Sequence, residues 1–189
     1  MKNRTKRFAA AIMATVMCLA ILGACSSTGG GSNSPDNVGT FTTQDINGQS
    51  VTQDIFKDYD LTLVNIFATW CSPCVSEMPD LEKLHQKMAG KNVNVVGILL
   101  DAMDEDGNLD QNAISEAQQL VKDTGVTYPV LIPDAGYMNG RLSNIEAFPE
   151  TFFVDKDGNI VGETYSGSSD LEGWLEVVEK ELADLNGDK

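Results

Sequence analysis

Histidine and cysteine are scarce in this sequence of 189 residues, which has one histidine, His85, and four cysteines. A structural zinc site usually takes four cysteine or histidine ligands. Cys18 and Cys25 lie in an N-terminal leader, so the rest of the chain offers only Cys71, Cys74 and His85. His85 stands next to a glutamine and near lysines, which predicts a solvated position on a helix. We therefore expect no metal site and no separate cofactor.

Basic residues are also few, with 13 Lys and Arg against 28 Asp and Glu and a formal net charge of -15. Four of these basic residues fall within the first seven positions, so the remainder of the chain is still more acidic. Such a surface repels nucleic acid and anionic lipid. The composition predicts no nucleic-acid partner, and any hold on a membrane must come from an attached lipid.

The N-terminus lacks an apolar run long enough for a membrane span, which needs about 20 residues. Residues 8–24 are uncharged, follow a basic start and end in Leu22-Gly23-Ala24-Cys25. This pattern predicts a signal peptide over residues 1–24. Its end resembles the lipobox of bacterial lipoproteins, which implies a lipid on Cys25 and a place on the extracytoplasmic side of the cell membrane. An ordinary secretory cleavage site is the alternative.

Residues 25–39 are rich in Gly, Ser and Asn and predict a flexible linker behind the lipid anchor. Residues 40–189 have the length of one domain. Their apolar patterns predict a β-hairpin at 41–52 around Asn47-Gly48 and a short helical turn at 54–58. They also predict strands at 61–68, 93–100, 128–132, 151–154 and 160–164, and helices at 75–88, 111–124 and 171–185. Residues 101–110 are expected to be a solvated loop. The order predicts an α/β fold with a central mixed β-sheet covered on both faces.

The pair Cys71 and Cys74 lies at the junction between a predicted buried strand and the helix that follows it. The first turn of a helix carries unpaired N–H groups and partial positive charge, which favour a thiolate. Pro73 suits this turn because its missing N–H would have had no partner. The pattern predicts thiol–disulfide exchange, in which Cys71 attacks and Cys74 resolves the mixed disulfide. Half of a zinc site and a purely structural disulfide are the alternatives, although a loop of this size gives little stabilisation.

The segments Phe67-Ala68-Thr69-Trp70-Cys71-Ser72-Pro73-Cys74, Glu77-Met78-Pro79 and 148–155 together resemble the thioredoxin superfamily. The resemblance covers about residues 41–185 and is closer to the membrane-anchored branch typified by TlpA and ResA. It implies a thioredoxin-like fold with an N-terminal β-hairpin extension. It further implies that Pro149, which follows Phe148, has a cis peptide bond and faces the two sulfurs. Trp70, Ser72 and Pro73 would surround the site. An ordinary trans proline in a loop is the alternative.

The same resemblance places Glu77 near the two cysteines. A carboxylate there would raise the pKa of the thiols by like-charge repulsion, and it could relay a proton to or from the second sulfur. A solvated glutamate on the helix surface is the alternative. Asn65 stands where cytoplasmic thioredoxins carry an aspartate, and an amide cannot titrate, which strengthens the hypothesis for Glu77.

The sequence thus predicts a lipid-anchored, extracytoplasmic thiol–disulfide oxidoreductase that reduces exported proteins through Cys71 and Cys74. The resemblance implies recharging by a membrane electron conduit of the CcdA or DsbD type and clients such as apocytochrome c. A disulfide-introducing oxidant is the alternative of the same class. A copper-delivery lipoprotein is the alternative of another class, but such proteins typically use a wider cysteine spacing and a distant histidine. A peroxidase of the peroxiredoxin type would need a proline before its reactive cysteine, which residues 67–70 lack.

Overall fold

The computed structural model describes residues 36–104 and 106–187. The predicted signal peptide at 1–24, the lipid site Cys25 and most of the linker lie outside the described residues, as does Cys18. No helix within the described ranges combines the length and the apolar character that crossing a membrane requires.

A mixed five-stranded sheet forms the centre of the domain, in the order β5-β4-β3-β6-β7. Its strands are β3 (Leu61–Phe67), β4 (Val93–Leu99), β5 (Val130–Leu131), β6 (Glu150–Asp155) and β7 (Ile160–Ser166). β4 is parallel to β3 and β5, whereas β6 is antiparallel to β3 and β7. The sheet therefore confirms the predicted mixed topology.

Every residue of β3 and β4 is buried, because both faces of the sheet are covered. Successive side chains along a strand point to opposite faces. Leu61, Leu63 and Phe67 belong to one hydrophobic core, and Val64 and Ile66 belong to the other. This double burial explains why these strands read as continuous apolar runs in the sequence.

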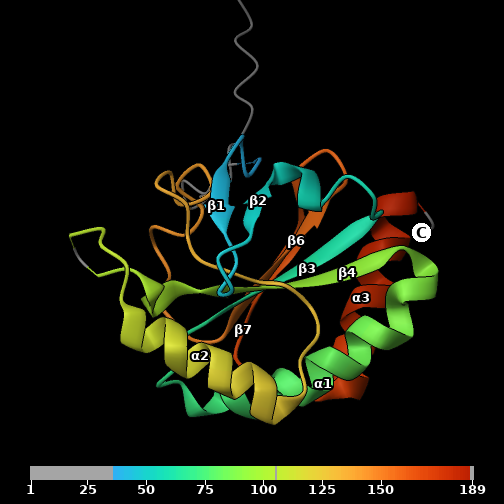
Figure 1. Ribbon diagram of the computed structural model, residues 1–189. Coiled ribbons are helices and arrows are strands. Elements are labelled where there is room, and N and C mark those ends of the chain that lie inside the picture. The colour runs from blue at the N-terminus through green and yellow to red at the C-terminus, as the bar shows by residue number, and fades with distance from the viewer. Residues whose placement is uncertain (1–35, 105, 188–189) are drawn as a thin grey trace, which may run out of the picture. The chain divides into compact units, whose positions relative to one another are not determined.

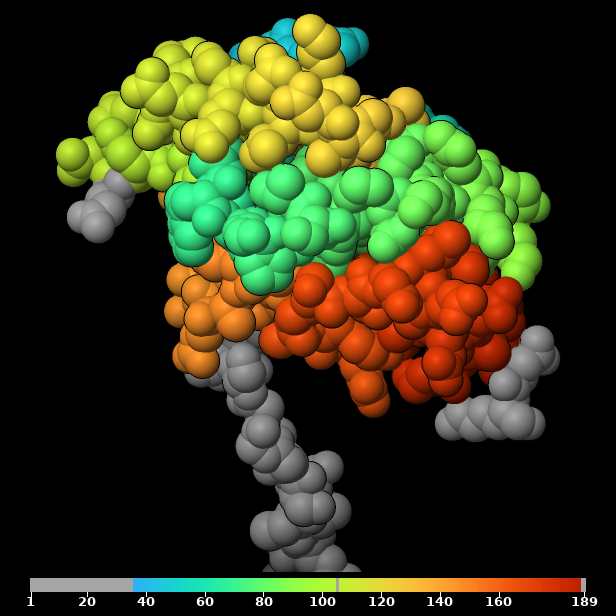
Figure 2. Space-filling view, turned by 90° about the horizontal axis from the view of Figure 1, so that it is seen from below, coloured from blue at the N-terminus to red at the C-terminus, as the bar shows by residue number. Residues whose placement is uncertain are grey.

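Helices α1 (Ser72–Met88), α2 (Gln111–Thr124) and α3 (Leu171–Asn186) all contribute buried side chains to the same core. They lie side by side on one face of the sheet, with α1 in the middle (Figures 1 and 2). Each of α2 and α3 begins at an aspartate whose carboxylate accepts backbone N–H bonds and ends at a glycine with positive φ. These caps explain why both helices have bounds close to those that the sequence predicts.

The opposite face of the sheet is covered by loops and the N-terminal hairpin of β1 (Thr42–Gln44) and β2 (Ser50–Thr52), and by no α-helix of the described residues (Figure 1). Phe41 and Phe56 flank this hairpin and enter the second core. Val38 is also buried there, and its N–H bonds to the carbonyl of Gly158. Val38 therefore packs with the domain, although it lies within the predicted linker.

Three turns share the pattern Asp-x-Asp/Asn-Gly-Asn/Gln, at residues 45–49, 104–108 and 155–159. In each turn one carboxylate oxygen accepts the N–H groups two and four residues later. The glycines have φ of 83°, 80° and 80°, a region that favours glycine. The acidic segment after β4 thus contains a tight turn of the same chemistry as the turns between β1 and β2 and between β6 and β7.

Candidate active site

Cys71 and Cys74 form a disulfide at the point where β3 passes into α1, with 2.02 Å between the sulfurs. Cys71 is the N-cap residue of α1, and Pro73 lies in the first turn. The backbone N–H of Cys74 donates a hydrogen bond to Sγ of Cys71 over 3.3 Å. Cys71 and Cys74 are only 4% and 1% exposed, so both side chains are almost fully buried in the disulfide form.

Exposed side chains border this disulfide. Ser72 and Pro73 are exposed, and Trp70 is 69% exposed. The Trp70 ring meets the ring of Phe148 edge to face, with 5.4 Å between the centroids. The Phe148–Pro149 peptide bond is cis, which is the isomer that the family resemblance implies. An apolar surface made by Trp70 and Phe148 therefore stands beside the cysteine pair.

Glu77 lies one turn after Cys74 on α1 and is only 2% exposed. Its Oε1 accepts a hydrogen bond from the amide of Asn65 over 2.9 Å. Its Oε2 accepts bonds from the backbone N–H of Ser169 over 3.2 Å and from the indole of Trp174 over 3.3 Å. The burial excludes a solvated glutamate, and the contacts join α1 to β3 and to α3.

Burial disfavours the charged form of this carboxyl group. It raises the pKa of Glu77 from 4.5 to about 7, although the hydrogen bonds from Asn65, Ser169 and Trp174 oppose the rise. Glu77 therefore changes its protonation state near neutral pH. A group of this kind can hold or release a proton under physiological conditions.

Residue spacing contains no signal for the contacts of Glu77 with Ser169 and Trp174, because these partners lie 92 and 97 residues further along the chain. It also missed a buried ion pair beside Pro149. Nη2 of Arg141 lies 2.9 Å from Oε1 of Glu150, and its guanidinium group stacks 4.3 Å above the ring of Phe152. The pair ties the loop before β6 to the first residue of that strand.

Asp101 belongs to η3 (Leu100–Ala102), a short 3-10 helix directly after β4, and not to a solvated loop as predicted. Its Oδ2 accepts hydrogen bonds from the backbone N–H and the hydroxyl of Thr69. The parallel pairing of β3 and β4 brings these residues together, because Phe67 and Leu99 occupy the same register. Sequence spacing alone could not find this contact.

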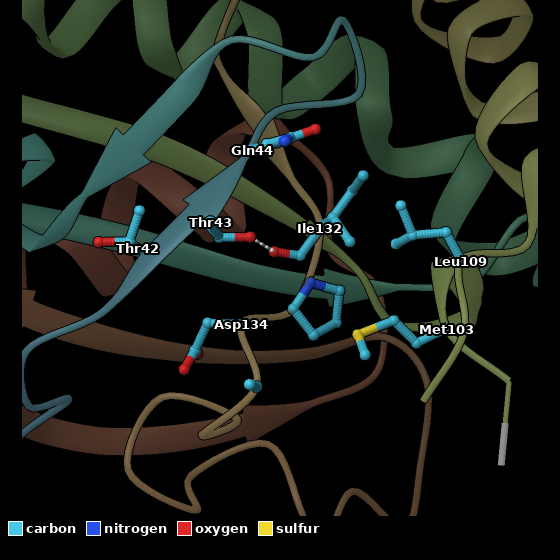
Figure 3. A pocket seen from close by; sticks show the side chains of 9 residues that line it. Thr42, Thr43, Gln44, Met103, Leu109, Ile132 and Asp134 are labelled. Carbon is cyan, nitrogen blue, oxygen red and sulfur yellow. Dashed lines mark hydrogen bonds between the residues drawn. The ribbon is translucent and has the colours of Figure 1, made fainter. Parts of the chain in front are cut away.

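A hollow of about 210 Å³ lies beyond the ends of β4 and β5. Met103 and Leu109 line one side of it, and Ile132 lies between them and Thr43, whose hydroxyl donates a hydrogen bond to the carbonyl of Ile132 (Figure 3). None of the predicted site residues lines this hollow, so it is separate from the disulfide.

His85 is half-buried rather than solvated, so the sequence prediction is wrong. Its ring packs edge to face against the ring of Tyr128, with 6.2 Å between the ring centroids. Its Nδ1 is buried without a hydrogen-bond partner among the described residues. No three Asp, Glu, Cys or His side chains within residues 36–104 and 106–187 come close enough to hold a metal ion.

A C-x-x-C disulfide at the start of the helix that follows the central strand of this mixed sheet defines a thiol–disulfide oxidoreductase with a thioredoxin-like fold. Sequence comparison leads to the same class. The chain belongs to the Redoxin family, to which residues 31–176 match.

Curated relatives carry names of the same activity. The chain is 29% identical over 140 residues to the thiol-disulfide oxidoreductase ResA of Bacillus cereus, covering 73% of this chain and 74% of that protein. It is 29% identical over 130 residues to the thiol:disulfide interchange protein DsbE of Haemophilus influenzae, covering 69% of this chain and 64% of that protein. A thiol:disulfide interchange protein of Chlorobium tepidum has a similar solved structure, with a TM-score of 0.62 and 24% sequence identity. The match covers 82% of this chain and 99% of that one.

Proposed function

We propose that this oxidoreductase is held at the extracytoplasmic face of the cell membrane by a lipid on Cys25 and reduces disulfides of exported proteins. The observation that carries the reaction is the Cys71–Cys74 disulfide at the first turn of α1. The basic start, apolar core and Leu22-Gly23-Ala24-Cys25 ending of the leader support the location. The acidic composition supports a lipid, rather than surface charge, as the link to the membrane.

In the proposed cycle the reduced enzyme carries two thiols. The Cys71 thiolate attacks a client disulfide, forms a mixed disulfide and releases one client thiolate. The Cys74 thiolate then attacks Sγ of Cys71 and releases the second client thiolate. Two electrons pass to the client, whose two thiolates take up two protons, and the enzyme is left with the Cys71–Cys74 disulfide.

The geometry supports these roles for the two cysteines. Cys71 is the more exposed of the pair, and its sulfur accepts the N–H of Cys74, a bond that favours a thiolate. Cys74 lies deeper, within one turn of Glu77. With a pKa of about 7, Glu77 can accept the proton that Cys74 must lose before it attacks.

The surface of Trp70 and Phe148 is proposed to receive the client chain beside the cysteine pair. Pro149, next to Phe148, would border the same surface. The oxidised enzyme would be reduced again by a membrane electron conduit of the CcdA or DsbD type. Apocytochrome c is a suitable client, because its C-x-x-C-H thiols must be reduced before haem attachment.

The reduction potential of the Cys71–Cys74 couple tests the direction of the reaction. We expect a value well below about -200 mV, at which the couple passes electrons to client disulfides of higher potential. The measurement equilibrates the purified full chain with glutathione or dithiothreitol buffers and quantifies the two forms by mass spectrometry. A potential near -120 mV, typical of strong oxidants, would instead show that the protein introduces disulfides.

A further inference from the structure

Asp101 makes a contact that the proposed cycle does not use. Its Oδ2 lies 3.0 Å from the backbone N and 2.7 Å from Oγ1 of Thr69. Its Oδ1 is buried and has no hydrogen-bond partner within the described residues. A buried carboxylate oxygen without a partner is costly and unusual, which points to a role beyond packing.

The residue that Asp101 holds belongs to the turn that places Cys71. The N–H of Cys71 donates to the carbonyl of Ala68 over 3.1 Å and closes a turn over residues 68–71. Thr69 is the second residue of that turn. The first turn of α1 fixes Cys71 from one side, because the N–H of Val75 bonds to its carbonyl. Asp101 fixes the turn from the other side.

We infer that Asp101 is a positioning residue for Cys71, because its two hydrogen bonds to Thr69 hold the turn before the nucleophile in the reactive geometry. This inference rests on the proposed role of Cys71 as the attacking thiol.

Thr69→Val tests this role, because valine keeps Asp101 and the size of the side chain but loses the hydroxyl bond. We expect insulin reduction about tenfold slower, a loss typical of one positioning hydrogen bond. Thr69→Ser, which keeps the hydroxyl, should restore the native rate.

Insulin reduction is measured in the full chain with both cysteines present. Asp123→Asn on the exposed face of α2 is the control and should leave the rate unchanged.

An unchanged rate in Thr69→Val overturns the inference, and so does a rate in Thr69→Ser that is as low as the rate in Thr69→Val. Failure of the proposed function is a separate result, because the chain with native Asp101 would then reduce no client disulfide.

Discussion

Serine in place of Cys74 is expected to stop the reaction halfway. Cys71 can still attack a disulfide in this variant, but the second thiol that would release it is missing. The reduced protein should bind one equivalent of client through a mixed disulfide and show no turnover. Mass spectrometry after mixing with a disulfide peptide counts the equivalents, and the same variant in living cells should retain its client covalently.

Cys71→Ser is the matched control, because it also leaves one thiol in the C-x-x-C pair. It should form the mixed disulfide much more slowly than Cys74→Ser does, because Cys74 is more deeply buried than Cys71. If Cys71→Ser traps the client and Cys74→Ser does not, the roles of the two cysteines are reversed.

Glu77→Gln is expected to remove a pH dependence of folding stability. Glu77 has a pKa of about 7 in the folded protein and 4.5 as its ordinary value. Between these pH values the folded state holds a proton that the unfolded state has lost, so stability falls as pH rises from about 4.5 to 7. The loss of folding stability amounts to about 3 kcal/mol, because each tenfold difference in proton affinity between the folded and unfolded states corresponds to about 1.4 kcal/mol.

The glutamine variant should lack this slope. Its side chain can direct the oxygen to Ser169 and Trp174 and its NH₂ to Asn65, whose amide can rotate to accept. Urea unfolding of the disulfide form at pH 5 and pH 8 measures the effect in both proteins. Glu176→Gln on α3 controls for the loss of one carboxylate. A slope that persists in Glu77→Gln would show that another group titrates.

The sheet and helices could be predicted because local chemistry specifies them. Strands buried on both faces give continuous apolar runs, and caps such as Asp110 and Gly125 mark the ends of α2. The sequence also placed Cys71 and Cys74 at a helix start, since strand, C-x-x-C and helix are contiguous. The placement of all three α-helices on one face could not be read in this way, because strand order and face are long-range properties.

The surroundings of the cysteines were predicted less well, for the same reason. Asp101 reaches Thr69 through the pairing of two parallel strands, and Trp174 reaches Glu77 through the packing of α3 on α1. His85 was misjudged because its chain neighbours are polar, whereas its ring packs against Tyr128 from another element. Contacts between distant segments follow from the fold and leave no pattern in the residue spacing.

Turnover of a protein disulfide tests the central claim most directly. The purified full chain is compared with the variant in which Cys71 and Cys74 are both serine, using insulin as the substrate and dithiothreitol as the source of electrons. The exchange mechanism predicts that the native pair accelerates insulin reduction well above the rate with dithiothreitol alone and that the double serine variant does not. Equal rates for the two proteins would contradict it.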